Sequence, residues 1–101
     1  MSAERIAIIG RLRPGSSERA NEVIEQGPPF ELGEAGLERH SVFVCSDCVL
    51  FVFEGRDVEQ LVRRLVDDPA VSAGFGAWGP LLDGTPQLAH ERFFWERPSR
   101  R

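Results

Sequence analysis

The sequence predicts an α+β fold of four antiparallel strands and two helices, in the order strand, helix, strand, strand, helix, strand. Residues 37–54, LERHSVFVCSDCVLFVFE, contain two runs rich in Val and Phe around a polar pair, which is typical of a β-hairpin. The residues after this hairpin repeat apolar side chains at helical spacing, and short β-rich runs lie near both ends of the chain. At 101 residues, the chain is long enough for one domain with a modest core.

Residues 5–12, RIAIIGRL, are predicted to form a central strand whose side chains alternate between two faces. One face carries Ile6, Ile8 and Leu12, and the other carries Ala7, Ile9 and Arg11. Residues 14–17 interrupt this strand and supply an N-cap for a helix of roughly ten residues, which ends at Gly27-Pro28-Pro29. We expect residues 30–36 to be irregular, with Phe30 and Leu32 directed inward.

The hairpin has two apolar faces, whichever register its turn adopts. If Cys45 lies opposite Cys48, one face carries Ser41, Phe43, Cys45, Cys48, Leu50 and Val52. The other face then carries Val42, Val44, Val49, Phe51 and Phe53. An antiparallel hairpin with one solvated face alternates apolar and polar residues, and this one does not. Both faces are therefore expected to be covered.

The best-defined helix follows the hairpin. Asp57 and Gln60 have the residue types of a capping box, and a helix is predicted through Val66. Its buried side consists of Val58, Leu61, Val62, Leu65 and Val66, while Arg63 and Arg64 face water. A second helical piece is predicted over residues 70–78, ended by Pro80 and the turn at residues 83–86. Residues 87–96 are predicted to form the last strand.

The composition excludes several classes of function. The net charge is -4 and every basic residue is an arginine, which argues against a nucleic-acid partner. No apolar run is long enough to cross a bilayer, so a membrane role is also not expected. The opening residues, MSAERIAIIG, lack the layout of a signal peptide, which predicts a cytoplasmic protein with reduced cysteines. We expect one domain over residues 1–96 and a flexible tail over residues 97–101.

The element order is that of a ferredoxin-like sandwich, in which both helices cover one face of the sheet. The other, apolar face then needs a second subunit or a ligand. The chain resembles the dimeric α/β-barrel superfamily over residues 5–96, in its element order, the RLRPG end of the first strand, the paired strands and the sequence Trp78-Gly79-Pro80. This superfamily includes stress-responsive barrel proteins, small cofactor-free monooxygenases, muconolactone isomerases and sugar mutarotases.

The resemblance implies a homodimer that packs sheet to sheet through the open face. It does not carry over the chemistry of the stress-responsive proteins, because Ile6 stands where several of them have a His near the start of the first strand. The absence of Tyr also removes a residue that related enzymes often use in their pocket.

The C-x-x-C sequence at Cys45 and Cys48 suggests redox chemistry or a metal site, but a strand follows it, whereas a reactive thiolate needs a helix N-terminus. A zinc site within one subunit would need His40 and His90, and His40 is about 16 Å along the strand from Cys45. An intersubunit zinc site remains an alternative. We prefer two small thiols at a hairpin end, with no metal.

His40, His90 and Arg92 are the candidate catalytic residues, with His as an acid or base and Arg92 as an anion clamp. The two histidines are expected on opposite edges of the sheet, about 14 Å apart, so they cannot act on each other within one subunit. A small hydrophobic ligand is expected in an apolar pocket lined by Phe75, Trp78, Phe93 and Trp95.

Two functions follow from these candidate residues. The preferred one is the binding of a small hydrophobic metabolite by a dimer that uses no cofactor. The alternative is a cofactor-independent enzyme of the monooxygenase, isomerase or cyclase kind, in which a single His transfers a proton with assistance from Arg92.

Overall fold

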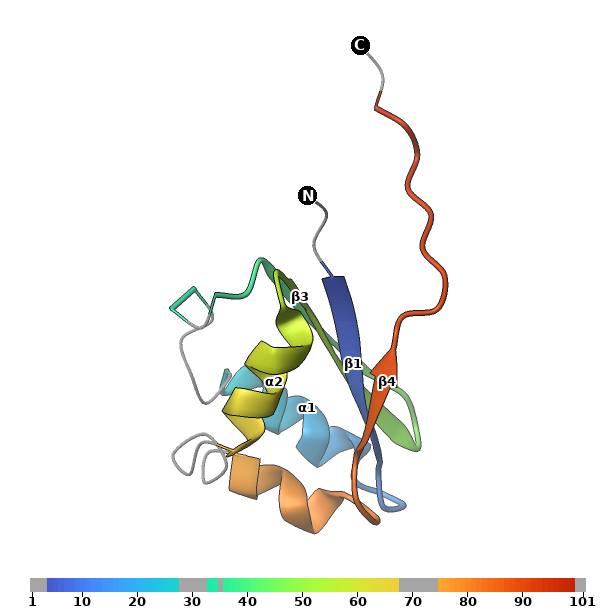
Figure 1. Ribbon diagram of the computed structural model, residues 1–101. Helices are drawn as coiled ribbons and strands as arrows, with labels where there is room; N and C mark the ends of the chain where they lie inside the picture. Colours follow the sequence, from blue (N-terminus) through green and yellow to red (C-terminus); the bar gives the residue numbers. More distant parts are fainter. Residues whose placement is uncertain (1–3, 28–32, 35, 68–74, 100–101) are drawn as a thin grey trace.

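The computed structural model describes residues 4–27, 33–34, 36–67 and 75–99. It contains a four-stranded antiparallel sheet in the order β2-β3-β1-β4, and two α-helices (Figure 1). The elements are β1 (Glu4–Arg11), α1 (Ser17–Glu25), β2 (Arg39–Val44), β3 (Cys48–Gly55), α2 (Val58–Asp67), the 3-10 helix η1 (Phe75–Leu81) and β4 (Gln87–His90). This is a ferredoxin-like α+β fold, as the sequence predicts.

The register of the central hairpin is the one expected from its sequence. Val44 is opposite Val49, and the backbone N–H of Cys45 donates to the carbonyl oxygen of Cys48 at 2.9 Å. Because side chains alternate along a strand, this register fixes which hairpin residues face the helices. Val49 and Phe53 are buried on that face.

The core lies between the sheet and the helices, in two clusters. One cluster joins α1 and η1 to the end of the sheet near the hairpin turn and contains Leu12, Ala20, Val23, Val49, Trp78 and Leu81. The other joins α2 to the sheet and contains Ile6, Phe53, Val58 and Val62. Phe51 packs against both clusters. Both helices therefore cover the same face of the sheet, as predicted.

The opposite face of the sheet is apolar and carries none of the described helices. In its middle, Phe43 pairs with Leu50, and Leu50 pairs in turn with Ile9. Phe43 is 57% exposed and Ile9 is 38% exposed, although both are large hydrophobic residues. The second apolar face predicted from the sequence is therefore present, and in the single chain it is exposed to solvent.

The C-terminal part of the chain differs from the prediction. β4 ends at His90 instead of Glu96, and residues 91–99 continue without regular structure away from the sheet (Figure 1). β4 pairs with residues Ile6 to Ile9 of β1. Beyond Ile6, the described part of β1 contains only Arg5 and Glu4, so a longer β4 would have almost no partner for its backbone groups. The division into a domain over residues 1–96 and a tail over residues 97–101 stays a prediction.

The segment between α2 and β4 also differs in part. Residues 70–74 of the predicted second helical piece lie outside the described residues, as do Phe30 and Leu32. Phe75–Leu81 is a 3-10 helix, and it continues through Pro80, which was expected to end the segment. None of the described helices is long and apolar enough to cross a membrane.

Candidate functional site

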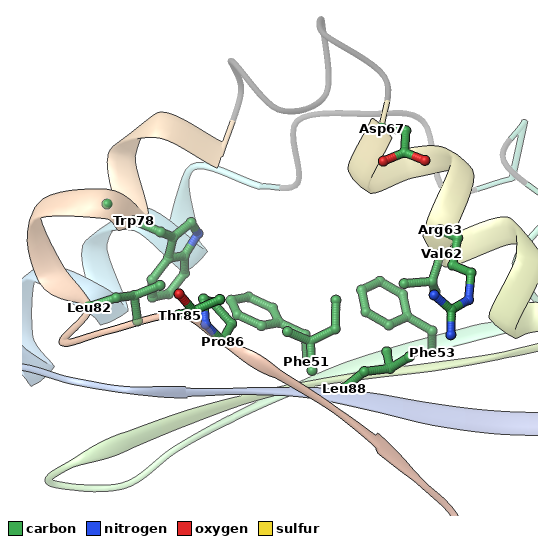
Figure 2. Close-up of a pocket in the computed structure, with 12 residues that line it drawn as sticks. Phe51, Phe53, Val62, Arg63, Asp67, Trp78, Leu82, Thr85, Pro86 and Leu88 are labelled. Carbon is green, nitrogen blue, oxygen red and sulfur yellow. The ribbon is translucent and has the colours of Figure 1, made fainter.

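A cavity of about 610 Å³ lies between the sheet and the helices α2 and η1 (Figure 2). Its floor is formed by side chains of three strands, and Val62 and Trp78 close it from the two helices. The lining residues are Ile8, Phe51, Phe53, Val62, Arg63, Asp67, Trp78, Gly79, Leu82, Thr85, Pro86 and Leu88. Most of them are apolar, and three are aromatic.

The cavity exists because α2 and η1 pack at different places on the sheet. Val62 of α2 belongs to one core cluster, and Trp78 of η1 belongs to the other. Phe51 lies between the two helices and contacts both clusters without filling the space above it (Figure 2). The two halves of the core therefore leave an apolar space between them.

Trp78 is placed as the sequence predicts, against the sheet in the wall of this cavity. Its side chain is 6% exposed and meets the ring of Phe51 edge to face, with centroids 5.1 Å apart. Such an edge-to-face contact adds to the stabilisation that comes from apolar burial alone. Trp78 thus serves both the core and the cavity wall.

The other predicted lining residues are not brought to the cavity. Phe93 is 84% exposed and Trp95 is 65% exposed, because both follow the end of β4 and so leave the sheet. Their predicted placement between the sheet and the second helix is therefore wrong. Phe75 is the first residue of η1, and the position of its side chain lies outside the described part of the structure.

Arg92 also differs from its predicted placement. It was expected beside His90 on the last strand, but it lies beyond the end of β4 and is exposed. The segment that contains it is held to the sheet by Arg5, whose Nε donates to Oε2 of Glu91 at 2.6 Å. The guanidinium of Arg5 also lies over the ring of Phe94, 3.8 Å from its centroid. Arg92 therefore does not lie on β4 beside His90 as predicted.

His40 and His90 lie on opposite edge strands, β2 and β4, as predicted. His40 is half-buried on β2, with its ring stacked on Phe53 at a centroid distance of 4.6 Å. Its Nδ1 donates to the carbonyl oxygen of Val52 at 2.9 Å, since a carbonyl can only accept. Burial lowers the pKa of His40 below 6.5, and the hydrogen bond to Val52 only partly offsets this. These contacts hold the His40 ring against β3.

The lowered pKa of His40 predicts a pH dependence of stability. The unfolded chain takes up a proton more readily than the folded protein, so stability is complete above about pH 6.5 and falls as the pH drops below that value. We expect His40→Gln, which does not titrate, to lose less free energy of unfolding than the wild type between about pH 7.5 and pH 5.5. Urea unfolding at both pH values measures this difference, and equal losses in the two proteins would contradict the assignment.

His90 has partners on α2 that the sequence did not indicate. Its Nε2 lies 3.0 Å from Oε1 of Glu59, and Oε2 of Glu59 accepts a hydrogen bond of 2.7 Å from Arg63. The hydrogen bond from Arg63 holds the pKa of Glu59 below its usual value, and His90 acts in the same direction. A carboxylate, an imidazole and a guanidinium are therefore joined in one exposed cluster. Because Arg63 also lines the cavity, this cluster reaches its rim.

The sequence indicates the ion pair between Glu59 and Arg63, but it does not indicate that Arg63 lies at the cavity rim. Glu59 and Arg63 are four residues apart on α2, a spacing at which opposite charges pair on a helix surface. Arg63 is exposed, as predicted. The approach of β4 to this helix face is a tertiary contact, and no local pattern predicts it.

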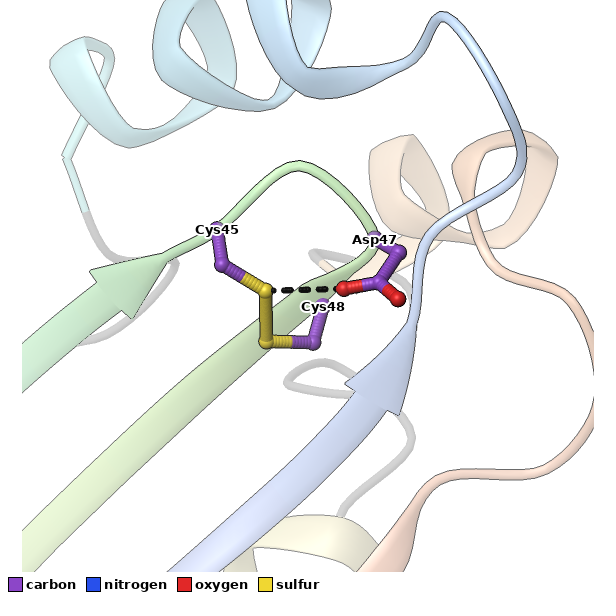
Figure 3. The surroundings of a disulfide bond; sticks show 3 residues. All are labelled: Cys45, Asp47 and Cys48. Carbon is purple, nitrogen blue, oxygen red and sulfur yellow. Dashed lines mark hydrogen bonds between the residues drawn. A yellow bond between two sulfur atoms is a disulfide. The ribbon is translucent and has the colours of Figure 1, made fainter.

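Cys45 and Cys48 form a disulfide at the tip of the hairpin, with Cα atoms 5.1 Å apart (Figure 3). The prediction of two reduced thiols is therefore wrong. The register that places the two residues opposite each other also brings their sulfur atoms together. Among the described residues, the metal-ligating types Cys45, Asp47 and Cys48 gather here, and neither histidine joins them.

Comparisons with known proteins give matches only at the level of structure. No protein-family model matches the chain, and no curated protein matches its sequence. A solved structure of tetracenomycin F2 cyclase from Streptomyces glaucescens, a type II polyketide cyclase, superposes with a TM-score of 0.71. It is 19% identical, and the match covers 93% of this chain and 98% of that one.

Two further structures are similar over most of their length. L-rhamnose mutarotase from Formosa agariphila gives a TM-score of 0.69 at 17% identity, with 93% of this chain and 99% of that chain covered. A putative antibiotic biosynthesis monooxygenase from Chloroflexus aurantiacus gives 0.59 at 13% identity, with coverages of 94% and 98%. The chain has the same ferredoxin-like fold as these proteins. The resemblance seen in the sequence is thereby confirmed for the fold, and these identities carry no activity with them.

Proposed function

We propose that this protein binds a small hydrophobic metabolite in the cavity between the sheet, α2 and η1. The observation that supports this most strongly is an apolar space of about 610 Å³ inside a domain of only 101 residues. The space also opens to the surface on one side, so a ligand can enter it from solvent. The volume lies within the range of sites for small molecules.

The walls favour a ligand that contains aromatic or other flat rings. Phe51, Phe53 and Trp78 present ring faces and edges to the cavity, which suits stacking and edge contacts with a flat molecule (Figure 2). Arg63 and Asp67 lie at the α2 end of the cavity and are exposed, so they can bind a polar group at one end of the ligand. Binding of this kind needs no cofactor.

The proposal predicts that one polar substitution in the wall weakens binding. Leu88 lines the cavity, and Leu88→Asn should reduce the affinity for the neutral probe N-phenylnaphthylamine about tenfold, because an amide then replaces apolar contacts. Leu37 packs against the same core cluster without lining the cavity, so Leu37→Asn is the matched control and should bind as the wild type does. Equilibrium dialysis measures both affinities, and an equal loss in the two variants would contradict the site.

A cofactor-independent enzyme is the second candidate, and the contact between His90 and Glu59 favours it. A carboxylate 3.0 Å from Nε2 can orient the imidazole, as a general acid or base requires. Of the two predicted histidines, His90 is the acid or base in this alternative, and Arg92 no longer assists it because Arg92 lies beyond the end of β4. Arg63, at the cavity rim, takes over as the anion clamp.

The test of this second candidate separates turnover from binding. Aromatic and polyketide-like compounds that raise the Tm of the protein are incubated with wild type and His90→Ala, and products are sought by mass spectrometry. Product made by the wild type and lost in His90→Ala, with the Tm shift retained, would support the enzyme. If the wild type converts none of the bound compounds, binding alone remains.

We further propose that two copies pack sheet to sheet through the open face. Apolar side chains in register across three strands, with Phe43 and Ile9 exposed, form a surface that a single copy leaves in water. Opposite charges border this surface, because Arg5 lies between Glu54 of β3 and Glu91, which follows the end of β4. A second copy presents the same surface and is therefore a self-complementary partner.

The proposed location is the cytoplasm, which fractionation of host cells would check.

A further inference from the structure

We propose that Cys45 and Cys48 form a redox-active pair, which exchanges between a disulfide and two thiols by reaction with low-molecular-weight monothiols. The pair lies at the hairpin tip, and neither cysteine lines the cavity, so this inference is independent of the ligand binding proposed above. It differs from redox catalysis of the thioredoxin kind, which uses a thiolate at a helix N-terminus. The two cysteines here are part of a β-turn.

The two sulfur atoms differ in their accessibility. Cys45 is exposed at the end of β2, whereas Cys48 is half-buried as the first residue of β3. Exchange requires an incoming thiolate to reach one sulfur and the other sulfur to leave. Exposure therefore makes Cys45 the site of attack and Cys48 the leaving group.

A cation is positioned to stabilise the leaving thiolate. Arg11, the last residue of β1, is directly opposite Cys48 in the antiparallel ladder. Residues in such positions share a face and have Cβ atoms about 5 Å apart. The N–H of Leu12 also donates to the carbonyl oxygen of Asp47 at 3.0 Å, which fixes the turn against the end of β1. The Arg11 side chain therefore leaves β1 next to Cys48, and its guanidinium can reach the charge that develops on the Cys48 sulfur.

The reduced form has a further stabilising contact. Oδ1 of Asp47 lies 3.1 Å from Sγ of Cys45, a distance at which a reduced thiol donates a hydrogen bond to the carboxylate (Figure 3). Interactions that stabilise the reduced form make a disulfide easier to reduce. Asp47 acts on the Cys45 sulfur and Arg11 on the Cys48 sulfur, and both favour reduction of the disulfide.

The fold does not depend on the disulfide. The strands are already paired next to the turn, with Val44 opposite Val49 and a backbone hydrogen bond of 2.9 Å from Cys45 to Cys48. A cross-link that spans a very short loop removes little entropy from the unfolded chain. The same hairpin can therefore hold either redox state.

The exchange consists of two balanced steps. The thiolate of a first monothiol attacks Sγ of Cys45, which breaks the protein disulfide and releases Cys48 as a thiolate. The thiolate of a second monothiol then attacks the sulfur of the first, which forms the external disulfide and releases Cys45. Two electrons pass from the monothiols to the protein, and their two protons are taken up by Cys45 and Cys48.

The first test equilibrates the protein with mixtures of reduced and oxidised glutathione across a wide range of ratios. Free thiols are then trapped by alkylation and counted by intact mass spectrometry. We expect a reversible transition between zero and two alkylated cysteines, with a change in Tm of less than about 5 °C between the two end states. A protein that stays fully oxidised or fully reduced at every ratio would overturn the proposal.

The second test examines the role of Arg11. We expect Arg11→Gln to slow reduction of the disulfide by glutathione about threefold to tenfold, because the leaving thiolate loses its cation. Arg13 is an exposed arginine just beyond β1 and has no register contact with either cysteine, so Arg13→Gln is the matched control and should react at the wild-type rate. Equal rates in the wild type and in both variants would contradict the arrangement described here.

Discussion

Phe43→Glu should dissociate the proposed sheet-to-sheet dimer into monomers. Phe43 is 57% exposed on the open face of the sheet, where it pairs with Leu50 across the hairpin. In a sheet-to-sheet dimer this position is occupied once by each copy, so the substitution places two carboxylates in an apolar interface without partners. We expect the dissociation constant to rise at least about 100-fold, as measured by sedimentation velocity over a range of concentrations.

The control for this prediction uses another exposed phenylalanine. Phe93 is 84% exposed in the segment after β4 and belongs to no strand of the sheet, so Phe93→Glu adds the same charge without altering a strand residue of the open face. It should remain dimeric. A wild-type protein that is monomeric at every concentration would contradict the proposed dimer, and so would dissociation caused by Phe93→Glu but not by Phe43→Glu.

Trp78→Ala should reduce the free energy of unfolding by about 3–5 kcal/mol. The side chain is 6% exposed, packs with residues of α1 and the sheet, and meets Phe51 edge to face. Among the described residues of η1, Trp78 and Leu81 belong to the core cluster, and Trp78 is much the larger, so the attachment of η1 to the core depends mainly on this ring. The loss is a large part of the stability of a domain of this size, and urea unfolding measures it.

Trp95 provides the matched control because it is 65% exposed. Trp95→Ala should change the free energy of unfolding by less than about 0.5 kcal/mol. If Trp78→Ala does not fold, the milder Trp78→Phe gives the same comparison and should still be clearly less stable than wild type. Equal effects at the two tryptophans would show that η1 does not pack as described.

The hairpin was predictable because its information is local. The Val and Phe runs specify strands, the polar pair Ser46-Asp47 specifies the turn, and alternation then assigns each side chain to a face. Val49 and Phe53 are buried and Phe43 is exposed, which is the division that the predicted register implies. The position of the helices on one face followed from element order alone.

The last strand was predicted too long because a strand needs both an alternating side-chain pattern and a neighbouring strand, and the prediction used only the pattern. Phe93 and Trp95 continue the alternation that begins in β4, so the local sequence is compatible with a strand. A strand also needs a neighbour for its backbone groups, and β1 provides one only to the region of His90. The sequence alone does not show where the partner strand ends.

The candidate site was predicted only in part, because some of its contacts depend on tertiary packing that the local sequence does not show. Trp78 was found from composition and placed correctly, since a buried tryptophan next to a sheet is a common wall for an apolar cavity. The contact between Glu59 and His90 joins residues 31 positions apart, so it depends on how α2 crosses the sheet. The disulfide was missed because the predicted compartment, rather than the hairpin geometry, decided the state of the cysteines.

Binding in the cavity is the central claim, and energy transfer from Trp78 tests it most directly. The chain has two tryptophans, so Trp95→Phe leaves Trp78, in the cavity wall, as the only one. On titration of this variant with N-phenylnaphthylamine, we predict a saturable loss of tryptophan emission and a matching gain of probe emission, at one probe per chain. Unchanged Trp78 emission over the full titration, or quenching that never saturates, would contradict a binding site between the sheet, α2 and η1.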